Sequence, residues 1–279
     1  MVNKDYFKGL VNRAIEKLSE LENLVNVNSN RVVIIGDLHG DVESLEKIIN
    51  DYPPGNWLYI GLGDYVDRGE YQVETLEKVL KLFLQGVMIP LRGNHESYVM
   101  NEVYGFMDEA LPLLGSSLLN TVIHELFPSL PYAALLNNKV LLLHGGLAKG
   151  LERVNDILKL SKHDDEPSDP VAFQILWNDP SDEVTGFVDS PRGPGAYLFG
   201  PDITMRFIEV NDVALIIRGH SYITDGYWRF HEGKVLSLFT SSSGPYYGAK
   251  PKVAVFLNGV LKVVDVKSRN VVMDIKLTQ

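Results

Sequence analysis

The sequence predicts an α/β fold in which a mainly parallel sheet carries a second, partly antiparallel sheet packed on it. Short β-branched runs alternate with amphipathic helical patterns through the first half of the 279 residues, as is typical of strand–helix–strand units. Apolar runs then dominate the last third, over residues 235–240, 252–257 and 260–266. Asn258-Gly259, between the last two runs, indicates a two-residue hairpin.

The first element is an amphipathic helix. Apolar residues recur at three- and four-residue steps across residues 5–25, which predicts one face of a helix that packs on the body of the protein. We therefore expect a single domain over residues 1–279, with an N-terminal packing helix in residues 1–28 and the core in residues 29–279.

Five later apolar runs each end at a glycine-flanked polar segment. Helices are expected between the early runs, over residues 45–49 and from about 73 to 84. The carboxyl ends of parallel strands lie at one edge of a sheet, where ligands bind, so all five segments are expected to meet at one rim. The expected strands cover residues 31–35, 57–61, 87–91, 139–143 and 213–217.

Composition excludes several classes of function. The net charge of -10 disfavours nucleic acid as a partner, because its phosphate backbone is bound by clustered Lys and Arg. The absence of cysteine excludes disulfides, thiolate metal sites and cysteine nucleophiles. Neither an 18-residue apolar stretch nor a secretory leader is recognisable, so we expect a cytoplasmic protein without a membrane partner.

The five polar segments contain a set of metal-ligating residue types. Carboxylate, amide and imidazole donors together suit Mn, Fe or Zn better than Ca or Mg, and the set is large enough for two ions. The segments are Gly36-Asp37-Leu38-His39-Gly40, Gly63-Asp64-Tyr65-Val66-Asp67-Arg68-Gly69, Gly93-Asn94-His95-Glu96, His144-Gly145-Gly146 and Arg218-Gly219-His220. The expected ligands are Asp37, His39, Asp64, Asn94, His144 and His220.

The remaining residues of these segments suit the cleavage of a phosphate ester. Two ions about 3.5–4 Å apart can share and activate one water, so that a bridging hydroxide is the nucleophile. His95 is the candidate general acid for the leaving alkoxide, and Asp67 is placed to orient it. Arg68 and Arg218 can bind phosphoryl oxygens, as can Arg192 from a long proline-rich segment.

That segment, residues 162–195, is expected to form long loops over the rim. Two interpretations remain open at this point: a surface connection, or a flap that contacts the substrate.

The motifs resemble the signature of the phosphoprotein phosphatase family, the metal-dependent serine/threonine phosphatases related to protein phosphatases 1 and 2A and to calcineurin. All five segments occur in the family's order. The resemblance implies the calcineurin-like metallophosphoesterase fold, a central β-sandwich of two mixed sheets flanked by helices. It also implies one metal on Asp37, His39 and Asp64, and a second on Asp64, Asn94, His144 and His220.

The same resemblance implies roles for residues outside the metal set. It pairs His95 as general acid with Asp67, and makes Arg68 and Arg192 phosphate contacts, with Arg218 nearby. Trp177-Asn178-Asp179-Pro180 resembles the family's Trp-Ser-Asp-Pro beside the substrate groove, which favours the flap. Residues 243–248, Ser-Gly-Pro-Tyr-Tyr-Gly, depart from the family's Ser-Ala-Pro-Asn-Tyr-Cys-Gly. Either Tyr246 or Tyr247 therefore replaces the family's tyrosine beside the metals, and spacing favours Tyr246.

The leading expectation is hydrolysis of phosphoserine and phosphothreonine in proteins or peptides, with some phosphotyrosine activity. Two ions are expected as cofactors, most readily Mn in vitro, with Fe or Zn as alternatives. A symmetrical dinucleoside tetraphosphatase is a second enzyme hypothesis. An inactive scaffold that binds phosphoproteins is a third, and it is disfavoured because His95, Asp67 and all ligands are present.

Overall fold

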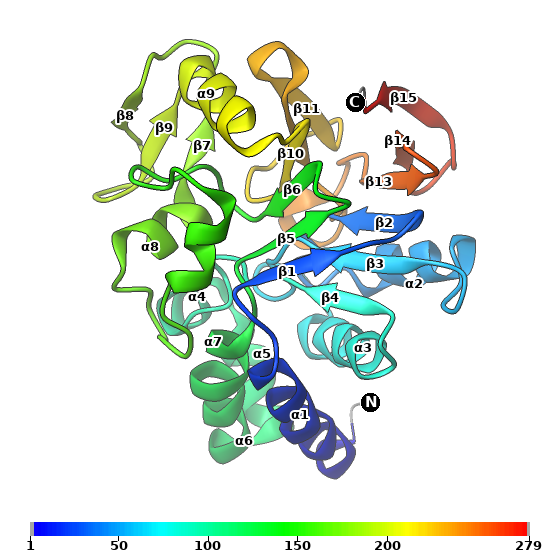
Figure 1. The fold of residues 1–279 in the computed structure, drawn as a ribbon. Helices are drawn as coiled ribbons and strands as arrows, with labels where there is room; N and C mark the ends of the chain where they lie inside the picture. The colour runs from blue at the N-terminus through cyan, green and yellow to red at the C-terminus, as the bar shows by residue number, and fades with distance from the viewer. Residues whose placement is uncertain (1–2, 278–279) are drawn as a thin grey trace.

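Two six-stranded mixed sheets stack at the centre of the computed structural model, which describes residues 3–277 (Figure 1). Helices cover the outer faces of this sandwich, and a small three-stranded sheet extends it at one side. The predicted sandwich of two mixed sheets with flanking helices is confirmed.

The first sheet contains three parallel strands that continue into three antiparallel ones. Strands β2, β3 and β4 run parallel, and β13, β14 and β15 add antiparallel along the free side of β2. The bounds are β2 Arg31–Ile35, β3 Leu58–Gly61, β4 Met88–Pro90, β13 Lys252–Leu257, β14 Val260–Asp265 and β15 Val271–Lys276. The predicted Asn258-Gly259 hairpin joins β13 to β14, and both of its residues have positive φ (49° and 86°).

The second sheet has the order β1-β5-β6-β10-β12-β11. Its middle strands β6, β10 and β12 are parallel, whereas β5 pairs antiparallel with β6 and β11 with β12; β1 runs parallel to β5. The bounds are β1 Leu24–Val27, β5 Ala133–Leu136, β6 Val140–Leu143, β10 Leu215–Arg218, β11 Tyr227–Phe230 and β12 Val235–Leu238. The small sheet consists of β7 Asp179–Pro180, β8 Phe187–Asp189 and β9 Tyr197–Phe199.

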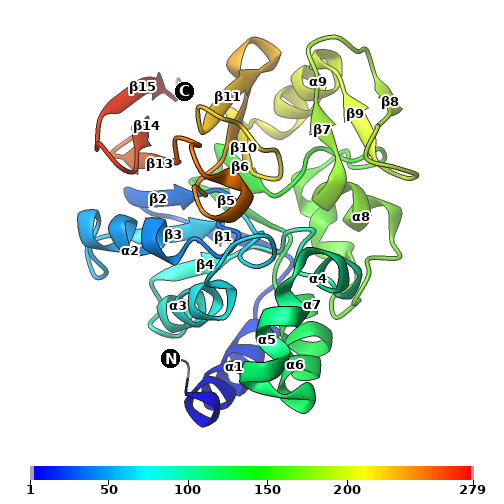
Figure 2. The ribbon, with the colours of Figure 1, turned by 180° about the vertical axis from the view of Figure 1, so that it is seen from behind.

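Alternation along the strands divides the apolar core into layers. In β2, Val32 and Ile34 face the other sheet, whereas Val33 and Ile35 face helices α1, α2 and α3. Helices α8 and α9 cover the outer face of the second sheet, and Figure 2 shows α1, α5 and α6 grouped at one end of the molecule. The helix bounds are α1 Lys4–Ser19, α2 Val42–Asp51, α3 Gln72–Leu84, α4 Tyr98–Tyr104, α5 Phe106–Leu114, α6 Ser116–Thr121, α7 Phe127–Ser129, α8 Pro170–Trp177 and α9 Pro201–Asn211. Within residues 3–277, no helix has both the length and the apolar character that crossing a membrane requires.

Two expectations are corrected by this topology. The five motif-bearing strands do not share one sheet, because β2, β3 and β4 lie in the first sheet and β6 and β10 in the second. The last strands do not form a separate sheet, since β12 joins the second sheet and β13 and β14 extend the first. β13 pairs antiparallel with β2, so the backbone N–H and C=O groups along the free side of β2 find hydrogen-bond partners.

Two local expectations are also corrected. The N-terminal helix ends at Ser19, and Leu24–Val27 forms β1 instead. Leu24 and Val27 are buried at the two ends of this short run, which pairs with β5. Residues 162–195 are not only loops: they contain α8, whose N-cap Asp169 accepts hydrogen bonds from two backbone amides, and strands β7 and β8.

Candidate active site

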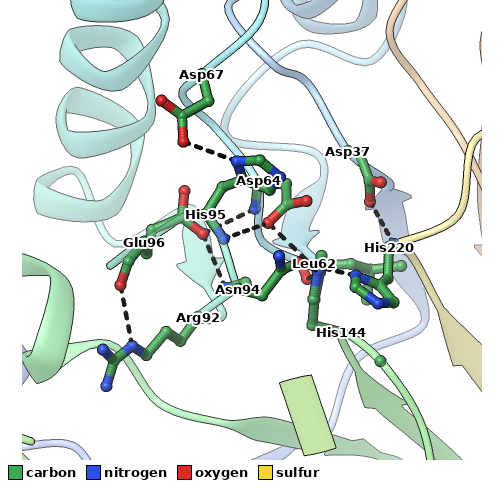
Figure 3. Close-up of polar contacts among 12 residues, drawn as sticks. Asp37, Leu62, Asp64, Asp67, Arg92, Asn94, His95, Glu96, His144 and His220 are labelled. Carbon is green, nitrogen blue, oxygen red and sulfur yellow. Dashed lines mark hydrogen bonds and ion pairs between the residues drawn. The ribbon is translucent and has the colours of Figure 1, made fainter. Parts of the chain in front are cut away.

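The five motif segments meet at one edge of the sandwich, although their strands belong to two sheets. The loops after β2, β3 and β4 approach from the first sheet, and those after β6 and β10 approach from the second (Figure 3). Side chains from four of the segments line a cavity of about 390 Å³, and His144 lies behind its wall, beside Asn94. Its lining residues are Asp37, His39, Asp64, Arg68, Asn94, His95, Met100, Tyr104, Trp177, Arg192, His220, Tyr222, Phe239 and Tyr246.

The amide oxygen of Asn94 lies between two imidazoles from the other sheet. His144 Nε2 is 2.9 Å and His220 Nδ1 is 2.8 Å from Asn94 Oδ1. His144 Nδ1 lies 2.8 Å from the Leu62 carbonyl oxygen, an arrangement that places its proton there and leaves the Nε2 lone pair for the site. The three side chains thus point their donor atoms at a common volume.

Asp64 connects this volume to a second one. Its carboxylate oxygens lie 3.3 Å from His144 Nε2 and 3.5 Å from His39 Nε2. His39 Nδ1 is held 2.9 Å from the Val66 carbonyl oxygen, so its Nε2 lone pair also points inward. Two triplets of close donor groups result, His39/Asp64/His95 and Asp64/His144/His220, and they share Asp64.

Asp37 belongs to neither triplet but faces the same cavity. Its Oδ1 accepts a hydrogen bond from the backbone N–H of His220 (2.8 Å), whereas Oδ2 is buried and has no hydrogen-bond partner among residues 3–277. Burial raises the pKa of Asp37 to about 7, and burial followed by the Asp37 charge raises that of Asp64 well above its usual range.

These observations fit a pair of cations. An unpaired buried carboxylate oxygen and two adjacent buried carboxylates are costly unless positive charge compensates them. Nitrogen and oxygen donors from both sheets supply the mixed ligand set of a transition-metal site. All six predicted ligands are brought together here: Asp37, His39, Asp64, Asn94, His144 and His220.

His95 belongs to the first triplet, but one of its ring nitrogens is paired with Asp67. Its Nδ1 lies 2.7 Å from Asp67 Oδ2, and its Nε2 faces the cavity, 3.3 Å from Arg68 Nη2. Burial, and then the Arg68 charge, holds the pKa of His95 well below its usual range, while burial raises the pKa of Asp67 to about 7. Asp67 also accepts hydrogen bonds from Asn101 Nδ2 and the Phe106 N–H, both at 3.0 Å. Donors to both carboxylate oxygens fix its orientation.

Arg68 and Arg192 both border the cavity. The Arg68 guanidinium lies 4.4 Å from the centre of the Tyr104 ring, a cation–π contact. Arg192 lies in the loop between β8 and β9. Arg192 and Trp177 are the residues of segment 162–195 that line the cavity. This placement agrees with the flap interpretation.

The structure does not place Arg218 in the cavity wall. Its side chain is 1 % exposed, and all three guanidinium nitrogens donate hydrogen bonds to protein oxygens. Nε donates to the Gly145 carbonyl (2.6 Å), Nη1 to Ser221 Oγ (2.8 Å) and Nη2 to Asp179 (2.8 Å). The expected phosphate contact is therefore corrected: these bonds turn Arg218 toward the protein interior behind the site.

The two candidate tyrosines differ in position. Tyr246 is 7 % exposed and stacks on His39, with ring centres 5.3 Å apart, whereas Tyr247 is 93 % exposed. Tyr246 is thus the one that lies beside the donor groups, as its spacing predicted.

Five non-glycine residues of the site have left-handed backbone conformations. They are His39, Asp64, Asp67, Arg68 and His220, with φ between 43° and 72°. This conformation costs about 1–2 kcal/mol per residue and requires surrounding interactions to hold it. The glycines between them allow close approach: a Cβ on Gly219 would lie 2.3 Å from Asp37 Oδ1.

One residue that the sequence reasoning did not assign supports the site from below. The buried Glu96 carboxylate accepts hydrogen bonds from the backbone N–H groups of Asp64, Tyr65 and Gly93, each at 2.8 Å. It thereby ties the loop after β3 to the loop after β4. Its position in Gly93-Asn94-His95-Glu96, directly after the candidate general acid His95, is the sequence feature that could have indicated this supporting role.

Comparison with known proteins agrees with this geometry. A family model described as calcineurin-like phosphoesterase matches residues 30–223. Among solved structures, a protein serine/threonine phosphatase from Saccharomyces cerevisiae with similarity to human phosphatase PP5 has 26% sequence identity and a TM-score of 0.87. The match covers 100% of this chain and 91% of that one.

Two more distant structures share the fold. A cold-active protein-tyrosine phosphatase from a psychrophilic Shewanella species has 16% identity and a TM-score of 0.60, with 94% of this chain and 84% of that one covered. A putative diadenosine tetraphosphatase has 17% identity and a TM-score of 0.52, with 88% and 98% covered.

Proposed function

This chain belongs to the calcineurin-like phosphoesterase family, and from that membership we propose that it is a metal-dependent protein phosphatase acting on phosphoserine and phosphothreonine. The observation that carries the proposal is the cluster of buried donor groups around Asp64, with His95, Arg68 and Arg192 on the same cavity. Ligands for two cations, a proton donor and two phosphate-binding groups are the components that metal-assisted phosphoester hydrolysis requires.

Asp37, His39 and Asp64 would hold one cation, and Asp64, Asn94, His144 and His220 the second. When bound, such a pair supplies Lewis acidity toward phosphoryl oxygens and lowers the pKa of a water molecule. Mn, Fe and Zn are the metals that this mixed donor set suits. The buried, unpaired Asp37 Oδ2 supports a cation at the first position.

Arg68 and Arg192 bind the phosphoryl oxygens in this proposal. Both guanidiniums reach the cavity, and each can present two N–H groups to a phosphate. Arg68 is also steadied by the Tyr104 ring. The two positive charges of these arginines would neutralise the charge of the phosphate dianion, which the net negative charge of the protein would otherwise repel.

His95 delivers the proton to the departing alkoxide. In the free site, burial and Arg68 keep its imidazole neutral. A phosphate dianion bound between the arginines offsets their charge and favours the imidazolium. Asp67, which is 2.7 Å from Nδ1, orients the ring so that Nε2 faces the substrate.

The protein substrate is supported by the whole-chain likeness to the yeast enzyme, at a TM-score of 0.87. Trp177 at the end of α8 and Met100 and Tyr104 of α4 line the cavity, and these side chains can contact the residue that carries the phosphate. The cytoplasmic location expected from the sequence stays a prediction.

The test compares substrates on the purified protein loaded with Mn²⁺. We expect phosphoserine and phosphothreonine peptides to be hydrolysed with higher kcat/KM than a matched phosphotyrosine peptide and than diadenosine tetraphosphate. A preference for the dinucleotide would refute the proposal in favour of the tetraphosphatase. Metal analysis of the same preparation should give two ions per chain, and Asp64→Asn should lower that number.

A further inference from the structure

Asp179, at the start of β7, binds two arginines at once. Its Oδ1 accepts hydrogen bonds from Arg218 Nη2 (2.8 Å), Ser221 Oγ (2.8 Å) and Arg192 Nη2 (3.3 Å), and its Oδ2 accepts one from Arg192 Nε. The carboxylate is therefore shared by the cavity-lining Arg192 and the buried Arg218.

The backbone N–H of Arg192 donates a hydrogen bond to Ser190 Oγ at 3.2 Å, and the tether to Asp179 fixes its side chain. Arg192 lies at the tip of the β8–β9 connection, followed by Gly193 and Gly195, both with positive φ. Its side chain is 31% exposed. Within residues 3–277, the hydrogen bonds of the Arg192 guanidinium go to Asp179 and Ser221.

Asp179, by contrast, is rigidly placed. Its strand β7 pairs with β9, and the neighbouring Asn178 donates to the Leu147 carbonyl (2.8 Å) and accepts from the Tyr197 N–H (2.7 Å). Although burial acts to raise it, the Arg218 and Arg192 guanidiniums hold the pKa of Asp179 below its usual range. The carboxylate is thus a fixed, charged anchor.

Resting on the function proposed above, we infer that Asp179 is the positioning residue that holds Arg192 in its phosphate-binding orientation, with Arg218 and Ser221 as the buried support of the carboxylate. The Nε and Nη2 groups of Arg192 face Asp179 and Ser221. Nη1 makes no hydrogen bond within the described part of the chain, so its two N–H groups are the ones left for phosphoryl oxygens.

The first test measures the tether without any enzyme activity. Trypsin must draw an arginine side chain into its own pocket before it cleaves after that residue, so a tethered Arg192 is protected. In Asp179→Asn, cleavage of the Arg192–Gly193 bond should accelerate at least tenfold, as followed by mass spectrometry. Asp182→Asn is the matched control: Asp182 accepts the His231 N–H at 2.7 Å and is not part of the cavity wall, so cleavage should stay at the wild-type rate.

The second test measures phosphate binding and turnover by Mn²⁺-loaded protein. For Asp179→Asn, we expect the Kd for inorganic phosphate and the KM for a phosphopeptide to rise about tenfold or more, with kcat changed less than KM. Arg192→Ala should give a similar rise, and the double variant should be within twofold of Arg192→Ala. Non-additivity of this kind is what a residue acting through its neighbour produces.

The inference would be overturned if folded Asp179→Asn showed the wild-type cleavage rate and phosphate affinity. It would also be overturned if the rise in phosphate Kd of the double variant equalled the product of the rises in Asp179→Asn and Arg192→Ala. If Asp179→Asn does not fold, Ser221→Ala replaces it, because this change removes one hydroxyl without leaving a buried charge unpaired. It should raise the phosphate Kd about threefold, and an unchanged Kd would count against the inference. Faster cleavage in a protein without phosphatase activity would support the tether and refute the proposed function separately.

Discussion

Replacement of His95 by Asn separates proton donation from metal binding. The His95 ring contacts Asp67 and Arg68, whereas its backbone N–H donates to Asp64 Oδ1 at 3.0 Å, a bond that Asn retains. Asp67 also keeps its donors from Asn101 and Phe106. We therefore expect the variant to fold and to bind the same amount of metal.

The expected loss depends on the leaving group. General-acid catalysis contributes about 10²- to 10⁴-fold, equivalent to about 3–5 kcal/mol of transition-state stabilisation. For a phosphoserine peptide, kcat should fall by this factor, since a serine alkoxide needs a proton. For an aryl phosphate with a stable phenolate leaving group, the loss should be less than tenfold. Equal losses on both substrates, measured with metal content matched, would refute the role of His95 as proton donor.

Two further predictions concern Asp37 and its surroundings. The pKa of the Asp37 carboxyl is raised from 3.8 to about 7 in the metal-free fold, so its ionisation destabilises the folded state increasingly as pH rises through that window. Relative to wild type, metal-free Asp37→Asn should gain stability between pH 4 and 7 in urea unfolding, and a constant difference would contradict this. Gly219→Ala should lower activity and metal affinity at least tenfold, because its Cβ would lie 2.3 Å from Asp37 Oδ1. Gly9→Ala, in α1 with no atom within 4 Å of the added Cβ, is the control and should stabilise the protein by about 1 kcal/mol without loss of activity.

The sequence was sufficient to place the donor groups because each follows a short apolar strand. Strands β2, β3, β4, β6 and β10 occur where the apolar runs predicted them, within about two residues. Periodicity describes one strand at a time, however, and does not say which strands pair. The division of these five between two sheets depends on long-range pairing, such as that of β13 with β2.

Side-chain roles were harder to predict where one residue type can serve two purposes. Arg192 and Arg218 both occur in Arg-Gly pairs, yet one lines the cavity and the other is buried. Both arginines donate hydrogen bonds to Asp179 and Ser221, so the difference arises from the backbone: Arg218 ends the buried strand β10, whereas Arg192 lies in the loop between β8 and β9. Tyr246 could be chosen over Tyr247 because its distance from Gly248 is a local property.

The hydrogen bond from the His220 N–H to Asp37 joins residues 183 positions apart. During synthesis at about 5–20 residues per second, roughly 10–40 s pass between the appearance of these two residues. The donor groups of the first sheet therefore leave the ribosome long before their counterparts from the second. Complete metal loading therefore has to wait until His144 and His220 have been synthesised and the two sheets have packed together.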